Sequence, residues 1–132
     1  MRMIIKEIES ADKCTYVIGN TDIGCIKGIW NYSELPVLNC SYFFELTIGE
    51  IDRNEISIVN KGNFFPSIST DGKQVSFRGI CEEIDEIYAV RFAQDWLEMI
   101  EVMNNDFTIH KNDVISFSLN CNSISIYPYK YD

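Results

Sequence analysis

Histidine is nearly absent from this 132-residue chain, which holds only one, and cations are few. Eleven Lys and Arg face twenty Asp and Glu, for a formal net charge of −9. Nucleophile arrangements of the Ser-His-Asp or Cys-His type need a histidine, and His110 lies among polar neighbours in an expected turn. No phosphate-binding glycine loop, dinucleotide fingerprint or calcium loop occurs. We therefore expect no enzyme, no catalytic residues and no cofactor.

Long apolar runs and paired-cysteine motifs are also missing. No run approaches the 18 or so apolar residues of a membrane helix. The N-terminus is charged at Arg2, Lys6 and Glu7, so it has no signal-peptide core. The five cysteines are odd in number and widely spaced, which favours reduced thiols over disulfides or a metal site. These features predict a cytoplasmic protein, residues 1–132 forming a single domain, with no membrane contact and no metal.

Short apolar segments broken by turns predict a mainly β fold with antiparallel, strongly curved sheets. Residues 42–48 alternate apolar and polar positions, and Asp71-Gly72 separates 65–70 from 73–79 in the manner of a hairpin with a type I′ turn. The apolar positions change parity after Gly79, which predicts a bulge there. Further strands are expected at 3–8, 14–18, 23–32, 55–59, 114–119 and 123–127.

Residues 86–103 admit two interpretations. As a helix, the segment would place Ala89, Ala93, Trp96 and Ile100 on one face, and the fold would be α+β with this helix packed on an antiparallel sheet. As two strands with a turn near 93–95, its β-branched and aromatic residues would alternate. The density of such residues favours strands.

A similarity between two segments of the sequence suggests two related halves. Residues 4–9 resemble residues 80–85, and each segment leads to a strand that contains a tyrosine. In each half a turn, near 38–40 and near 110–112, then precedes an apolar strand. The pattern predicts two β-rich pseudo-repeats, about 1–60 and 64–132, curled like small OB-type barrels.

Acidic residues are concentrated in residues 81–106. This stretch carries eight acids against one cation, Arg91, and so holds seven of the nine net negative charges. Such a surface disfavours nucleic acid and favours a basic protein partner. Trp96 lies among these acids, as a binding hot spot would. The candidate partner-binding residues are Glu82, Glu83, Asp85, Glu86, Asp95, Trp96, Glu98 and Glu101.

Two stretches carry a family likeness. Residues 23–30, followed by Pro36 and 42–48, form one; residues 91–102, with Val114 and the closing 126–129, form the other. Together they resemble the small acidic β-rich immunity proteins of bacterial polymorphic toxin and contact-dependent inhibition systems. The resemblance implies a protein that neutralises one cognate toxin domain, often a basic nuclease, and it transfers no site residues. The alternative is a small β-rich structural or regulatory module that self-associates, so both a monomer and a weak homodimer are open.

Overall fold

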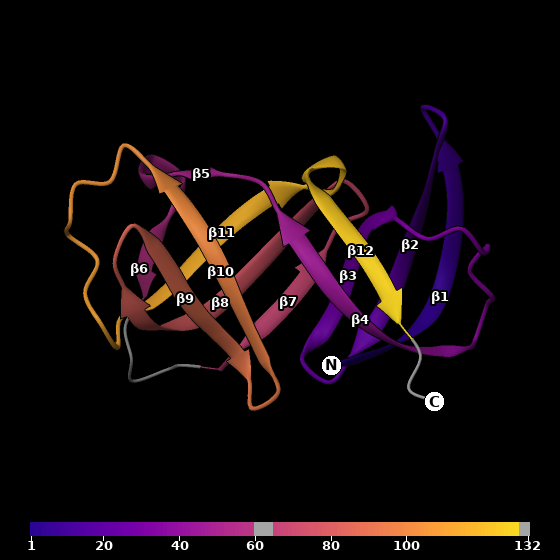
Figure 1. The fold of residues 1–132 in the computed structure, drawn as a ribbon, viewed down its shortest axis with the longest axis horizontal. Coiled ribbons are helices and arrows are strands. Elements are labelled where there is room, and N and C mark those ends of the chain that lie inside the picture. The colour runs from indigo at the N-terminus through magenta and orange to yellow at the C-terminus, as the bar shows by residue number, and fades with distance from the viewer. Residues whose placement is uncertain (60–64, 130–132) are drawn as a thin grey trace.

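The computed structural model describes residues 1–59 and 65–129, and strands make up 65% of it, with no helix of seven or more residues (Figure 1). The prediction of a mainly β fold is confirmed. The alternative helix over 86–103 is wrong, because these residues form two antiparallel strands joined by a turn. The described strands are β1 (Arg2–Ala11), β2 (Cys14–Thr21), β3 (Gly24–Trp30), β4 (Ser41–Ile48), β5 (Ile51–Asp52), β6 (Ser57–Val59), β7 (Ser67–Thr70), β8 (Gln74–Ile84), β9 (Ile87–Ala93), β10 (Trp96–Met103), β11 (Val114–Asn120) and β12 (Ile124–Tyr129), with 3-10 turns η1 (Arg53–Glu55) and η3 (Cys121–Ser123).

Five strands close into a barrel in the order β1-β2-β3-β12-β4, with β4 returning to β1. The pair β3–β12 is parallel, through Ser125 beside Ile29 and Ile126 beside Trp30. The other four pairs are antiparallel. A barrel of this kind removes sheet edges, which otherwise expose unpaired backbone groups.

The remaining strands form a second, open set, which joins the barrel through the pairing of β7 with β3 at Ile68 and Gly24. β8 pairs with β9 and β11, β9 pairs with β10, β10 pairs in parallel with β5, and β11 pairs with β6. β5 and β6 follow β4 in sequence, whereas β12 follows β11. The barrel is therefore completed by β12, which follows β11 of the second set. The second set includes β5 and β6, which follow β4 of the barrel. The junction between the two predicted pseudo-repeats, 60–64, lies outside the described residues.

The β1–β2 and β8–β9 hairpins carry the same irregularity. The register of β1 against β2 shifts between Ile5 and Glu7, and that of β8 against β9 shifts between Cys81 and Glu83. The two bulges fall at corresponding positions of the similar segments 4–9 and 80–85. A bulge raises the local twist and bends the strand, which is what a long strand needs at a barrel corner. The sequence predicted this bulge at Gly79, three residues too early.

The turns that precede β4 and β11 are also alike. The amide of Asn39 donates to the carbonyl of Ile5 (2.8 Å), and the amide of Asn112 donates to the carbonyl of Cys81 (2.7 Å). Both asparagines have positive φ, 64° and 74°. Asparagine tolerates this conformation better than most residues. The same backbone device thus positions β4 and β11.

The expected hairpin between β7 and β8 is present with a different turn. Val75 pairs with Thr70, and only Gly72 has positive φ, at 96°. The loop is therefore Gly72-Lys73, with glycine at its first position as in a type II′ turn, rather than Asp71-Gly72 in a type I′ turn. The Asp71 carboxylate accepts bonds from the amides of Lys73 and Gln74 (2.8 and 2.7 Å).

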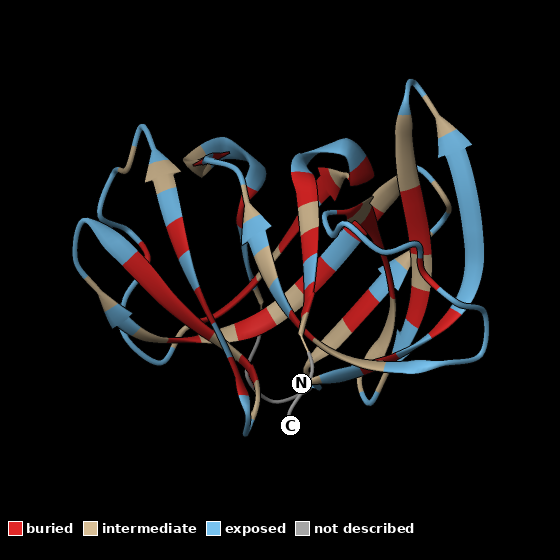
Figure 2. Ribbon diagram, turned by 45° about the vertical axis from the view of Figure 1, so that its right-hand side comes forward, coloured by how far each residue is buried: buried red, intermediate tan, exposed pale blue. Residues whose placement is uncertain are grey.

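Buried side chains from both sets form one apolar cluster. Figure 2 shows that buried residues occur along the strands on both sides of the molecule. Lys27, which is itself buried, ties the sets together. Its Nζ donates to Oε2 of Glu9 on β1 (2.8 Å) and to the carbonyl of Gly72 in the β7–β8 turn (2.7 Å), and it lies over the ring of Tyr16. The Glu9 hydrogen bond is the largest influence on the pKa of Lys27 and raises it.

Candidate functional site

The seven acids among the eight residues that the sequence singles out divide into two groups. The Glu82 carboxylate is bound by the guanidinium of Arg91, which lowers its pKa. Asp95, at the β9–β10 turn, lies 2.9 Å from the Met1 ammonium. Glu98 is buried. The negative surface is therefore smaller than the sequence predicted.

The other four acids keep exposed side chains. They are Glu83, Asp85, Glu86 and Glu101. Within residues 1–59 and 65–129 none of these carboxylates forms a hydrogen bond or an ion pair. The first three surround the β8–β9 turn, and Glu101 pairs across the sheet with Ile87, the residue after Glu86. The fold thus gathers these four charges at one end of the β8–β10 sheet.

Trp96 is not available as a surface anchor. It is 2% exposed, packs edge-to-face against Phe44 at 5.4 Å between ring centroids, and contacts Phe92. Its indole N–H donates to Glu98 within the same buried region. The prediction of Trp96 as a partner-binding residue is wrong, because β10 turns it toward the core with Ile100.

Phe107 presents an aromatic ring at the surface instead. It is 74% exposed and has φ of 59°, in the loop between β10 and β11. Its amide donates to Oδ1 of Asn105 (3.0 Å), and that same atom accepts a bond from the hydroxyl of buried Tyr88 (2.7 Å). An exposed ring in an unusual backbone conformation is therefore fixed to the core through one side chain.

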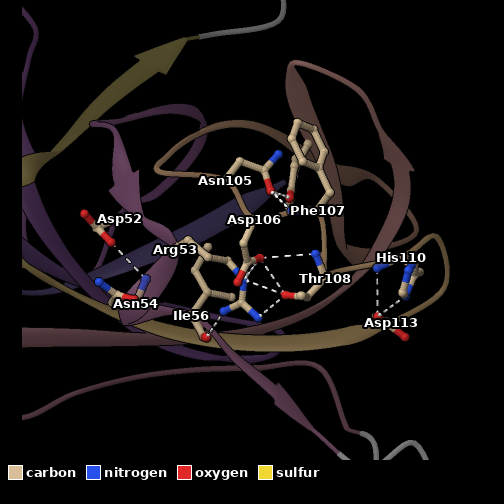
Figure 3. A network of polar contacts seen from close by, with 11 residues as sticks. Asp52, Arg53, Asn54, Ile56, Asn105, Asp106, Phe107, Thr108, His110 and Asp113 are labelled. Atoms are coloured by element: carbon tan, nitrogen blue, oxygen red, sulfur yellow. Dashed lines mark hydrogen bonds and ion pairs between the residues drawn. The ribbon is translucent and has the colours of Figure 1, made fainter.

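A second set of contacts holds the other side of this loop (Figure 3). Arg53 of η1 donates through Nε to Oδ1 of Asp106 (3.1 Å) and through Nη2 to Oγ1 of Thr108 (2.8 Å). Its Nη1 donates to the carbonyl of Ile56 (2.8 Å). Asp106 in turn accepts from the hydroxyl and amide of Thr108, and these bonds, the hydroxyl first, lower its pKa. Phe107 is held on both sides.

An open hollow of about 450 Å³ lies beside this ring. It is lined by Glu83, Ile84, Phe107, Ile109, His110 and Lys111. Of the four exposed acids only Glu83 lines the hollow, and Lys111 adds a cation to the lining. An exposed aromatic ring close to carboxylates can receive an apolar side chain flanked by cations on another protein. We refer to Phe107 with Glu83, Asp85, Glu86 and Glu101 as the Phe107 site.

The sequence did not single out Phe107 or Arg53. One local signal was available: Phe107 follows Asn104-Asn105-Asp106, and Asn and Asp favour turns in which their side chains bond to nearby amides. Such a segment is unsuited to a strand and leaves its aromatic residue outside the β pattern. The contribution of Arg53, 53 residues earlier than Asp106, carried no local signal.

All five cysteines are free thiols, as expected, and burial raises the pKa of Cys81 to about 12. In the described ranges, no three His, Cys, Asp or Glu side chains converge as a metal-ligand set. The same ranges contain no helix with the length and apolar character to cross a membrane. No protein-family model, curated protein or solved structure matches the chain.

Proposed function

We propose that this chain is a cytoplasmic binding protein that docks a basic partner at the Phe107 site, and that it acts as an immunity protein against a bacterial toxin domain. The observation that carries the proposal is the exposed ring of Phe107, on a backbone held by Asn105, beside a hollow that Glu83 also lines. Asp85, Glu86 and Glu101 are exposed at the same end of the β8–β10 sheet as Glu83. The likeness of residues 23–48 and 91–129 to acidic β-rich immunity proteins supplies the class of partner.

The charge distribution supports this choice of partner. With a net charge of −9 and free acids gathered at one end, the chain attracts a cationic surface and repels nucleic acid. A toxin that grips phosphates needs such a cationic surface. Rim charges speed the encounter and select the partner, whereas a desolvated aromatic supplies affinity. The site contains both elements.

Pre-organisation supports the role of Phe107. Ordering a flexible loop at an interface costs binding free energy, and a loop already held in place avoids that cost. Here the side chain of Asn105 accepts a bond from the Phe107 amide, and that of Asp106 accepts one from the Thr108 amide. The ring can therefore enter a partner pocket without further ordering of its backbone.

The decisive experiment is a binding titration against the toxin domain encoded beside the gene for this chain. We expect a nanomolar or tighter complex whose on-rate falls as salt rises. Phe107→Ala should weaken it by about 30-fold or more, since a hot-spot truncation costs at least about 2 kcal/mol. Phe65→Ala is the matched control, because Phe65 is 75% exposed and lies outside the Phe107 site.

Charge reversal tests the carboxylates of the Phe107 site separately from the aromatic ring. Asp85→Lys with Glu86→Lys should slow association and weaken binding, while Glu7→Lys with Asp22→Lys makes the same charge change at exposed positions away from the Phe107 site. Equal effects of the two double variants would show that charge acts only through the overall attraction between the two proteins. Unchanged affinity for Phe107→Ala, or no complex with the neighbouring toxin, would overturn the proposal.

A further inference from the structure

A second hollow, of about 440 Å³, separates the two sets of strands. Its walls are β4, through Phe44 to Ile48, and β10, through Leu97 to Met99. Figure 1 shows β4 and β10 running in the same general direction on the near face. Phe44 and Trp96 meet edge-to-face and bridge the two strands. The hollow is therefore a groove between two strands that do not pair with each other.

The β4 wall exposes an unpaired strand edge. The amide of Gly49 donates toward β12, to Ser123, while the amide of Phe44 donates to the opposite side, to Met1. Because successive amides of a strand alternate in direction, Leu46 and Ile48 turn their N–H and C=O groups away from β12, toward the groove. In the described part of the chain, β1 covers this edge only at residues 41–43. The edge beyond Phe44 can accept another strand.

The β10 wall contributes a carboxylate and an apolar surface. Glu98 is 9% exposed, and its Oε1 accepts the Trp96 indole bond. No hydrogen bond reaches Oε2 among the described residues, and every fully buried side-chain oxygen there has a partner. Oε2 must therefore be accessible, and the groove is the surface that Glu98 lines. Glu45 adds a second negative charge near it.

Apolar side chains flank this carboxylate. Met99 is 60% exposed and Leu97 is also exposed, both on the groove wall of β10. A groove with a free backbone edge, apolar flanks and a recessed anion matches an extended peptide with alternating side chains and one cation. A hydrophobic ligand would bury Glu98 further without a partner for Oε2, whereas a cationic side chain would compensate the charge of its ionised form.

We propose that this groove binds an extended peptide segment of a partner protein, which adds as a strand to the β4 edge at Leu46 and Ile48 and places a lysine or arginine against Oε2 of Glu98. The commitment to a cationic segment comes from charge complementarity with Glu98 and Glu45. The inference stands apart from the Phe107 site, and each can fail without the other.

The test begins with panning of a random library of nine-residue peptides against the whole protein. We expect enriched sequences that contain one Lys or Arg among alternating apolar residues. A synthetic copy of the best sequence should shift the backbone amide resonances of Leu46, Ile48, Leu97 and Met99. Glu98→Gln, which keeps an acceptor for Trp96, should weaken this peptide at least 10-fold. Norleucine in place of its cation should cause a similar loss.

Two controls separate the site from general attraction. Glu7→Gln removes an equal charge outside both the groove lining and the Phe107 site, and should leave peptide affinity unchanged. Methylation of alternate peptide amides should abolish binding in one of the two registers, because a strand bonds its neighbour through every second residue. No enrichment, unchanged affinity for Glu98→Gln, or shifts confined to the Phe107 site would overturn the inference. A dimer in light scattering that buries the β4 edge would also overturn it, since a second copy would then be the occupant.

Discussion

The indole nitrogen of Trp96 donates a 3.0 Å hydrogen bond to Oε1 of Glu98, two residues further along β10. Side chains two apart share a face of a strand, so this bond holds a carboxyl group inside the protein. Burial is the largest influence on the pKa of Glu98 and raises it to about 7. The Trp96 bond lowers it and the charge of Glu45 raises it. Glu98 is therefore the acid whose ionisation most strongly opposes folding.

Glu98→Gln should stabilise the protein at pH 8 and change little at pH 4. The pKa of Glu98 is raised in the folded state, so the protonated form is favoured there, and stability is lost as pH rises from the unfolded pKa of about 4.5 through about 7. A shift of this size corresponds to about 3 kcal/mol above pH 7. Urea unfolding at several pH values measures the difference.

The matched control for this prediction is Glu101→Gln, an exposed position on the same strand. Its effect on the free energy of unfolding should be small, because the side chain is exposed. A pH-independent effect of Glu98→Gln, or equal curves for the two variants, would contradict the assignment of Glu98 as a buried ionisable group.

Lys27→Met should destabilise the protein by about 1–3 kcal/mol, because it leaves the partly buried Gly72 carbonyl without its donor and removes the Glu9 ion pair. Methionine keeps much of the apolar stem, so loss of packing is minimised. Lys6→Met, at an exposed position of β1, is the control and should change stability by less than about 0.5 kcal/mol. Equal unfolding midpoints for both variants would show that Lys27 does not join the two sets of strands.

Arg53→Gln should release the loop that presents Phe107 while leaving the core intact. The variant loses the bonds to Asp106, Thr108 and the Ile56 carbonyl. The amide of Thr108 should then exchange with solvent faster, whereas core amides such as Val90 should keep their protection. Hydrogen exchange followed by NMR reads both. Uniformly faster exchange would instead indicate global destabilisation, and unchanged exchange at Thr108 would show that Arg53 does not order the loop.

Local patterning predicted the strands of the second half, and it did so for a physical reason. Tyr88, Val90 and Phe92 are buried at alternate positions of β9, and Trp96 and Ile100 share one face of β10. A strand that covers a core shows this period in its sequence. The helix interpretation grouped Ala89 with Trp96, but Ala89 lies on the opposite face of the sheet from the apolar cluster.

The candidate site was less accessible to prediction, because it depends on contacts between distant parts of the chain. The acidic segment suggested a single surface, but folding turns Glu98 inward and pairs Glu82 with Arg91. Closure of the barrel by β12, and the pairing of β5 with β10 and of β6 with β11, likewise leave no local pattern. The sequence therefore predicts which segments are strands better than it predicts which residues those strands expose.

The repeated turns offer a test of the relationship between the two halves. Asn39 and Asn112 both have positive φ, and their amides donate to the bulged strands β1 and β8, respectively. Replacement by alanine should cost about 1–2 kcal/mol at each position, because a Cβ without a compensating polar group disfavours this conformation. Asn39→Gly and Asn112→Gly should be nearly neutral, since glycine adopts it freely. Urea unfolding of all four variants, with exposed Asn31→Ala as the control, provides the measurement. A cost at one site alone would show that the two turns, though alike in geometry, do not contribute alike to stability.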